Sequence, residues 1–205
     1  NYDGYSEGDS GNVDGFGGHA NKETSTGNIF RGCRAWNNGD DGFDLINCYA
    51  SYIIEYCWSF RNGYKPHSIE SSGGNGAGFK SGGYGMGDIK KVPNPQHTVR
   101  YCLAYYNRQQ GFYSNHHLGG LIFENNTAYK NPSNYNMLNR KSSNEAVDVP
   151  GYGHIIKNNL SLSPRNSGGF PQHLINVDNT LSEIKNNSFA PNDLNILLLL
   201  SLFTP

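Results

Sequence analysis

Charged residues are scarce in this chain. Of its 205 residues, 16% are charged, and 16 Lys and Arg against 17 Asp and Glu leave a net charge of −1. Because proteins hold nucleic acid mainly through an excess of positive charge, we expect no nucleic-acid partner. Long hydrophobic runs are also missing: the most apolar stretch, 196–203, is eight residues long. Since roughly 20 apolar residues are needed to span a bilayer, we expect no membrane association.

The four cysteines do not have the spacing of a metal site. Cys33, Cys48, Cys57 and Cys102 form no C-x-x-C pair. The chain also lacks an initiator Met and a signal peptide, and opens on Asn1. We therefore expect a processed chain, or one that is incomplete at one or both ends, and the N-terminus does not reveal the compartment.

In place of charged residues and long hydrophobic runs, the chain is rich in asparagine, glycine and aromatic residues. The sequence holds 28 Asn, 26 Gly, 14 Tyr and 10 Phe. Disordered chains are poor in aromatic residues, and helical bundles need more of the good helix formers than this chain has. The composition therefore predicts a turn-rich, all-β protein.

One unit of about eight residues recurs along the chain. Its copies begin at Ile29, Ile53, Thr98, Ile122, Ile155 and Glu183, which lie 24, 45, 24, 33 and 28 residues apart. Short strands repeated at such a period indicate a solenoid, in which each coil buries its face only against its neighbours. We predict a single domain over 1–205, folded as a right-handed parallel β-helix.

The fifth position of the unit predicts an inner ladder of stacked side chains. It is occupied by Cys33, Cys57, Cys102, Asn126, Asn159 and Asn187. Successive coils lie about 4.8 Å apart, so Asn amides in one column can bond to each other, and Asn tolerates the left-handed backbone of a sharp corner. A Cys33–Cys57 disulfide is conceivable at this spacing, although we favour buried free thiols. At the eighth position we expect an aromatic stack, to which we assign Trp36, Trp58, Tyr105 and Tyr129.

A second repeat brings acidic residues together. It reads Asp14-Gly15-Phe16, Asp41-Gly42-Phe43, Ala77-Gly78-Phe79 and Gln110-Gly111-Phe112. If the Phe residues stack inside, Asp44 and Lys80, which follow Phe43 and Phe79, face outward together one coil apart. Asp14 and Asp41 share another column, with Asp40 beside Asp41. We therefore expect four carboxylates and one Lys on one patch of the outer wall.

This cluster predicts a calcium site. Like charges packed closely are costly unless a cation lies among them, and Ca²⁺ prefers oxygen ligands from flexible carboxylates. No Cys or His belongs to the cluster, which argues against zinc. The alternative is purely structural, because Asp-Gly is a common turn dipeptide and Lys80 beside an Asp can be an ordinary surface ion pair.

These motifs resemble polysaccharide lyase family 9. The segments that carry the resemblance are Asn12–Gly17, Asn38–Asp44 and Gly76–Gly83, and the similarity runs from about Gly11 to Arg140. The family includes pectate lyases, exopolygalacturonate lyases and enzymes that act on rhamnogalacturonan I. The resemblance implies a parallel β-helix, Ca²⁺ held by Asp14, Asp40, Asp41 and Asp44, and Lys80 as the catalytic base.

The implied chemistry is β-elimination on an acidic plant cell-wall polysaccharide. A base removes the C5 proton of a uronate, and the C4 glycosidic oxygen leaves. Ca²⁺ on the C6 carboxylate would stabilise the enolate-like intermediate and lower the pKa of Lys80, while the carboxylates would raise it. We therefore expect an alkaline pH optimum and loss of activity in chelator. Whether polygalacturonate or rhamnogalacturonan I is preferred, and whether cleavage is endo or exo, stays open.

Six further residues are weaker candidates for substrate binding. Tyr113, Asn115, His116 and His117 lie one coil beyond Lys80 and could line the same groove, and two arginines could clamp neighbouring uronates, namely Arg108 and Arg140. For each of the six, a solvated turn residue is the alternative.

Two other functions remain open for such a chain. A pectin hydrolase on the same solenoid would use two carboxyl groups and no metal, but the Gly-His-Gly and Arg-Ile-Lys segments of such hydrolases are missing. A non-catalytic β-helix that binds glycans or Ca²⁺ is the other alternative. From the expected substrate we infer a monomer that is secreted, periplasmic or at the cell surface.

Overall fold

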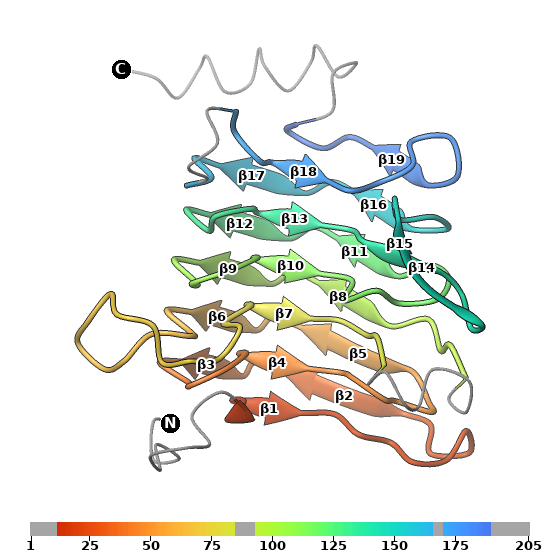
Figure 1. Cartoon of the computed structure of the whole chain (residues 1–205), viewed down its shortest axis with the longest axis horizontal. Coiled ribbons are helices and arrows are strands. Elements are labelled where there is room, and N and C mark those ends of the chain that lie inside the picture. Colours follow the sequence, from red (N-terminus) through yellow and green to blue (C-terminus); the bar gives the residue numbers. More distant parts are fainter. Residues whose placement is uncertain (1–11, 85–92, 166–169, 190–205) are drawn as a thin grey trace.

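The computed structural model describes residues 12–84, 93–165 and 170–189. These residues form a stack of coils built from short parallel strands, and no α-helix occurs among them (Figure 1). Each coil contributes strands to three long sheets that run the length of the stack. The parallel β-helix predicted from the repeats is confirmed.

The three sheets are named here A, B and C. Sheet A holds β1 (Phe16–Gly17), β4 (Phe43–Asp44), β7 (Phe79–Lys80), β10 (Phe112–Tyr113), β13 (Tyr135–Asn136) and β18 (Leu174–Ile175). Sheet B holds β2 (Asn28–Arg31), β5 (Tyr52–Glu55), β8 (Thr98–Arg100), β11 (Ile122–Glu124), β16 (Ile155–Lys157) and β19 (Glu183–Lys185). Sheet C holds β3 (Arg34–Trp36), β6 (Trp58–Phe60), β9 (Leu103–Tyr105), β12 (Thr127–Tyr129) and β17 (Leu160–Leu162). An antiparallel hairpin, β14 (Asn139–Ser142) and β15 (Glu145–Val149), extends from the stack (Figure 1).

The strand register follows the sequence repeat. The six residues that begin the repeat are Cα partners in successive strands of sheet B: Ile29, Ile53, Thr98, Ile122, Ile155 and Glu183. Coils of unequal length stay in register because the extra residues lie in the loops between sheets, where insertions are tolerated.

The core is a column of stacked rings behind sheet A. Phe16, Phe43, Phe79, Phe112 and Tyr135 follow one another with ring centroids 4.9, 4.9, 5.0 and 4.9 Å apart. This spacing is close to the distance between coils, so each ring packs on the equivalent ring of the next coil. The inward Phe column predicted from the second repeat is therefore confirmed.

The inner ladder lies where sheet B turns into sheet C. The Cys102 amide donates to Asn126 Oδ1 (3.0 Å), the Asn126 amide to Asn159 Oδ1 (2.9 Å), and Asn159 Nδ2 to Asn187 Oδ1 (3.0 Å). The four cysteines are free thiols. The left-handed residue of each corner is the one before the ladder residue, for example Asn125 with φ 55°.

A second Asn ladder was not predicted from the sequence. Nδ2 of Asn38, Asn62 and Asn107 donates to Oδ1 of the next member, and the distances are 2.7 Å to Asn62, 2.9 Å to Asn107 and 3.1 Å to Asn131. All four side chains are fully buried. This ladder lies at the end of sheet C, just before the loops that carry Asp40 and Asp41.

The predicted aromatic stack needs two corrections, one at Trp58 and one at Tyr129, which is the Cα partner of Tyr105 but packs edge-on against Tyr106. Trp36, Phe60 and Tyr105 stack on one another, with ring centroids 5.8 and 4.6 Å apart. Phe60 occupies the place assigned to Trp58, because Trp58 is the Cα partner of Arg34, two residues earlier in the coil.

No helix among the described residues is long and apolar enough to cross a membrane. The apolar stretch 196–203 lies outside the described residues.

Candidate active site

A column of glycines places the acidic residues at the edge of sheet A. Gly15, Gly42, Gly78 and Gly111 each precede a strand of this sheet, and a Cβ on any of them would come within 2.6–2.7 Å of the neighbouring coil. At all four, the obstacles include an amide nitrogen of the second Asn ladder and a backbone oxygen of the next coil. The chain must therefore pass this point without a side chain, which fixes the residue before each glycine, including Asp14 and Asp41.

Asp14, Asp40 and Asp41 form a compact carboxylate cluster. One oxygen from each lies within 4.8 Å of the others. In each residue Oδ1 accepts a backbone amide of the next coil: Asp14 from Asp41 (2.9 Å), Asp40 from Asn75 (2.5 Å) and Asp41 from Ala77 (2.6 Å). The backbone thus orients the three carboxylates toward one another.

Burial, with a smaller contribution from the neighbouring carboxylates, disfavours the negative charge of these three groups. Burial raises the pKa of Asp14 to about 7, and the charges of Asp44 and Asp40 add to the rise. Burial likewise raises the pKa of Asp41 to about 8, against the opposing effect of Lys80. The pKa of Asp40 is also raised, chiefly by burial. A cation bound among the three oxygens would offset the cost of ionising these buried groups.

Lys80 lies against two of the acidic side chains. Its Nζ is 2.9 Å from Asp44 Oδ2 and 3.2 Å from Asp41 Oδ2, and Asp44 is its Cα partner in the sheet. Burial alone would lower the pKa of Lys80, but Asp44 and Asp41 outweigh it and hold the pKa above its ordinary value. As predicted, Lys80 and Asp44 share a rung beside the cluster. They are not on an open wall, however, because only 8% and 4% of their surfaces are exposed.

Asp44 stands slightly apart from the other three carboxylates. Its Oδ1 accepts the Ile46 amide (2.7 Å), and its Oδ2 is held by Lys80. The structure thus brings Asp14, Asp40 and Asp41 together as one group and places Asp44 as the partner of Lys80.

A cleft of about 350 Å³ opens above this cluster. Its walls come from three coils and are formed by Asp41, Asn75, Ala77, Lys80, Gln109, Gln110, Tyr113, Asn115 and His116. Sequence analysis did not assign Asn75, Gln109 or Gln110 to the site. For Gln110 a signal existed, because it occupies the column of Asp14 and Asp41 in the second repeat.

Three of the predicted substrate-binding residues line the cleft. Tyr113 is the Cα partner of Lys80, and its hydroxyl is 2.9 Å from His116 Nε2. Burial raises the pKa of Tyr113 to about 12. Asn115 donates from Nδ2 to the Gly82 carbonyl (2.8 Å). These three side chains line the same cleft as Asp41 and Lys80.

Asp148 is a further residue that sequence analysis missed. It lies on β15, and its Oδ1 is 2.7 Å from His116 Nδ1 and 3.1 Å from Arg140 Nη1. The hairpin therefore braces the His116 side of the cleft.

The other three predicted substrate-binding residues do not line the cleft. His117 is 1% exposed and accepts the Gly83 amide at Nδ1 (3.2 Å), so it belongs to the interior rather than to the groove. Arg108 donates from Nη1 to the Gly74 carbonyl (2.8 Å) and thereby holds the loop that carries Asn75. Arg140 is buried on β14 and binds the Ala146 carbonyl and Asp148 of the hairpin. All three residues lie outside the cleft lining for the same reason: each side chain is hydrogen-bonded to another group of the protein.

The donor set fits a calcium ion. Hard carboxylate oxygens converge, burial and the neighbouring carboxylates raise the pKa values of Asp14 and Asp41, and the group of three contains neither Cys nor His. These are the ligands that Ca²⁺ prefers and that softer metals do not.

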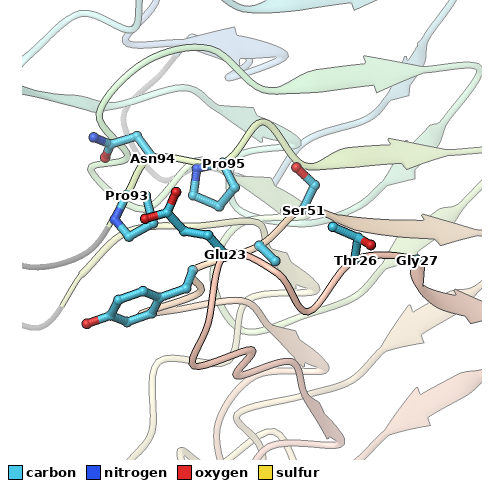
Figure 2. Close-up of a pocket in the computed structure, with 9 residues that line it drawn as sticks. Glu23, Thr26, Gly27, Ser51, Pro93, Asn94 and Pro95 are labelled. Carbon is cyan, nitrogen blue, oxygen red and sulfur yellow. The ribbon is translucent and has the colours of Figure 1, made fainter.

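A second cleft, of about 310 Å³, lies among the loops that precede β2, β5 and β8 (Figure 2). Figure 2 shows Glu23 beside Pro93 and Pro95, with Thr26, Gly27 and Ser51 on the other side. Among the described residues that line it, Glu23 is the single carboxylate and none is a lysine. This described lining thus does not pair an acid with a lysine as the first cleft does.

Comparisons with known proteins agree with this architecture. Residues 1–159 match the sequence model of the Pel9A-like right-handed β-helix region. The chain is 41% identical over 151 residues to pectate lyase L of Dickeya chrysanthemi, which covers 74% of this chain and 32% of that protein. It is 35% identical over 131 residues to pectate lyase PEL9 of Emericella nidulans, which covers 56% of this chain and 31% of that protein.

Two solved structures share the fold. A rhamnogalacturonan lyase superposes with a TM-score of 0.80 and 55% identity, over 92% of this chain and 46% of that one. Pectate lyase Pel9A superposes with a TM-score of 0.64 and 34% identity, over 87% of this chain and 38% of that one. The chain thus spans about a third of the length of the first curated relatives and less than half of these structures.

The family match tests two predictions, the handedness of the β-helix and the resemblance to polysaccharide lyases. It covers more than half of the chain and specifies a right-handed β-helix, so the predicted handedness is confirmed, as is the resemblance to lyases of this type. The chain belongs to the Pel9A-like right-handed β-helix family.

Proposed function

We propose that this chain carries the catalytic β-helix of a calcium-dependent pectic polysaccharide lyase. The observation that supports this most directly is the position of Lys80, which lines a cleft beside three converging carboxylates. The relatives named pectate lyase and rhamnogalacturonan lyase support the same reaction class.

In the proposed mechanism Lys80 is the base that takes the C5 proton of a bound uronate. When bound among Asp14, Asp40 and Asp41, Ca²⁺ would offset the charge of the uronate carboxylate and make the neighbouring C5 proton more acidic. Asp44 is the fourth ligand that the family resemblance implies. Its Oδ2 pairs with Lys80, and a weaker ion pair there would lower the pKa of Lys80 toward the neutral form that a base needs.

The polar side chains that line the cleft beside Lys80 suit a sugar. Tyr113, Asn115 and His116 present a hydroxyl, an amide and an imidazole to the same space as Lys80. We assign them to binding of substrate hydroxyls or carboxylates, with Asp148 and Arg140 as positioning residues behind His116.

Between the two candidate substrates, we propose the rhamnogalacturonan I backbone. The structure named rhamnogalacturonan lyase is 55% identical to this chain, against 34% for Pel9A. Such a polymer lies outside cells or in the periplasm, and the proposed localisation follows from that: secreted, periplasmic or at the cell surface. A monomer remains our proposal for the assembly.

Ultraviolet absorbance tests the reaction. Elimination leaves a C4=C5 double bond conjugated to the carboxylate, which absorbs, whereas hydrolysis leaves none. We expect absorbance to rise with rhamnogalacturonan I in Ca²⁺, more slowly with polygalacturonate, and not at all in chelator. Lys80→Ala should reduce the rate by about 10³-fold, within the range for loss of a general base.

The control for this experiment is Lys141→Ala. Lys141 is exposed and pairs with Glu145 on the hairpin, so its loss should leave the rate unchanged. New reducing ends without absorbance would indicate a hydrolase instead. Calcium-dependent melting with no product from either polymer would indicate a non-catalytic binding protein.

A further inference from the structure

The corner between sheets B and C contains an unusual pair of residues. The position before the inner ladder is left-handed in every coil, with φ of 68° at Gly32, 56° at Tyr56 and Tyr101, and 55° in the later coils at Asn125, Asn158 and Asn186. Gly and Asn adopt this conformation readily, whereas bulky residues seldom do. Bulky left-handed residues also occur at the other end of sheet C, at Arg61, Tyr106 and Lys130, so the two tyrosines are distinguished by their stacking and exposure rather than by their backbone alone.

The two tyrosines stack and leave a space beneath them. Their ring centroids are 5.0 Å apart at an interplanar angle of 7°, and the residues are 53% and 45% exposed. In the preceding coil the equivalent residue is Gly32, where an added Cβ would meet no atom within 4 Å. Residue 32 thus supplies no side chain to continue the stack on Tyr56, and we call the open space at this position the Gly32 niche.

Arginines surround the Gly32 niche. Arg31 is 65% exposed at its side chain and pairs with Glu55 (2.5 Å), which also pairs with Arg100 (2.7 Å). The Arg34 guanidinium lies 4.2 Å from the ring centroid of Trp58 and donates to the Gly32 carbonyl (3.0 Å). Two of these guanidinium groups share the single carboxylate of Glu55, whereas Arg34 lies over Trp58, so the arginines at the niche outnumber its paired carboxylate.

We propose that the Gly32 niche binds a carboxylated sugar of an acidic glycan, at a site separate from the catalytic cleft. The ring face of Tyr56 offers apolar contact for a sugar ring, and Arg31 and Arg34 offer donors for a carboxylate. The niche lies at the corner between sheets B and C, whereas Lys80 is on sheet A, so one polymer chain could be held at the niche while another segment enters the cleft. The identity of the glycan as a pectic uronate rests on the proposed function.

The repeat itself supplies variants that should preserve the fold. Gly32→Asn fills the niche, and Tyr56→Asn removes its wall, each with the residue that occupies the same corner at Asn125 and Asn158. Tyr106→Asn is the matched control, because Tyr106 is also left-handed (φ 54°) but lies at the other end of sheet C. Thermal melting of all three variants verifies the fold.

Binding is measured in the Lys80→Ala chain, so that the polymer stays intact. In native gels containing rhamnogalacturonan I or polygalacturonate, we expect both niche variants to bind about tenfold more weakly than the parent, and Tyr106→Asn to bind equally well. A neutral galactan should retard none of them. Unchanged retardation in the niche variants, or equal retardation by the galactan, would overturn the proposal. So would a concentration-dependent dimer that the variants abolish, because the corner would then be a contact between copies.

A second measurement separates this site from the proposed reaction. In the chain that retains Lys80, the niche variants should cleave short oligosaccharides at the parent rate and long polymer more slowly. Equal loss on both substrates would contradict a separate anchoring site. If no absorbing product forms at all, the proposed function fails while the gel experiment still decides the niche.

Discussion

At the scale of residues, the properties of the site depend on carboxyl groups whose pKa values are raised by burial. Asp41 is fully buried, and burial together with Asp40, Asp44 and Asp14 raises its pKa to about 8 despite the nearby Lys80. The pKa of Asp14 rises to about 7 for similar reasons. A cation must displace these protons before it can bind, so protons and calcium compete within an ordinary pH range.

Calcium affinity should therefore depend on pH. Asp14 and Asp41 are protonated below about pH 7 to 8, so we expect titration calorimetry to give an affinity at pH 5.5 at least tenfold weaker than at pH 8.5, since each proton displaced costs a factor of ten per pH unit. Asp41→Asn should abolish most of the binding. Asp148→Asn, which removes a carboxylate outside the cluster, should not. Equal affinity at the two pH values would show that the acids are ionised without calcium.

At the scale of elements, two Asn ladders hold the coil corners. Asn107 Oδ1 accepts both the backbone amide and Nδ2 of Asn62, while its own Nδ2 donates to Ser59 and Asn131. The glycine column packs directly against this ladder. The ladder thus fixes the loops on which Asp40 and Asp41 depend.

Asn107→Ala should destabilise the protein strongly. Because the change leaves buried partners without hydrogen bonds, we expect the free energy of unfolding to fall by about 3 kcal/mol. Denaturant titration measures this, and Asn94→Ala, at an exposed loop position, is the control. A loss below about 1 kcal/mol would mean that the ladder contributes little to the free energy of unfolding and that the stacked rings stabilise the coils instead.

At the scale of the whole molecule, three buried histidines connect the loops to the core. His97, His117 and His154 each accept a backbone amide at Nδ1, from Tyr52, Gly83 and Leu121 respectively. Burial lowers their pKa values to about 4, 3 and 4. Protonation at Nδ1 would break these hydrogen bonds, so the folded state needs the neutral rings.

Acid should therefore weaken the fold through these histidines. Their stabilisation is complete above the ordinary pKa of 6.5 and is lost as pH falls toward 4, by up to about 1.4 kcal/mol per pH unit for each ring. The raised pKa values of Asp14 and Asp41 oppose this, because the folded state then binds protons more readily than the unfolded state.

A single variant isolates the histidine effect. His97→Asn keeps an acceptor near the Tyr52 amide but does not titrate. The difference in unfolding free energy between parent and variant should shift in favour of the variant by about 2 kcal/mol between pH 7 and pH 5, because only the unfolded parent takes up a proton at this ring over most of that range. A difference that is constant with pH would show that His97 is already protonated or accessible.

Much of the molecule could be predicted from the sequence. Each coil repeats the same inward positions, so the register of Ile29 with Ile53, and of Asp44 with Lys80, could be obtained by aligning the chain with itself. The single-domain boundary of 1–205 stays a prediction. The role of Arg108, Arg140 and His117 could not be predicted, because it depends on Gly74, the hairpin and Gly83, which do not belong to the repeat.

The sequence by itself determined the parallel β-helix and the gathering of Asp14, Asp40, Asp41 and Lys80. Each coil stacks on the next, so residues at equivalent positions of the repeat come together, and the spacing of the repeat is enough to identify them. The tertiary structure decided how deeply Lys80 is buried, which side chains line its cleft, and that an open niche lies over Gly32. These properties depend on loops of unequal length that fold over the coils, and on what each side chain meets there, which periodicity does not specify.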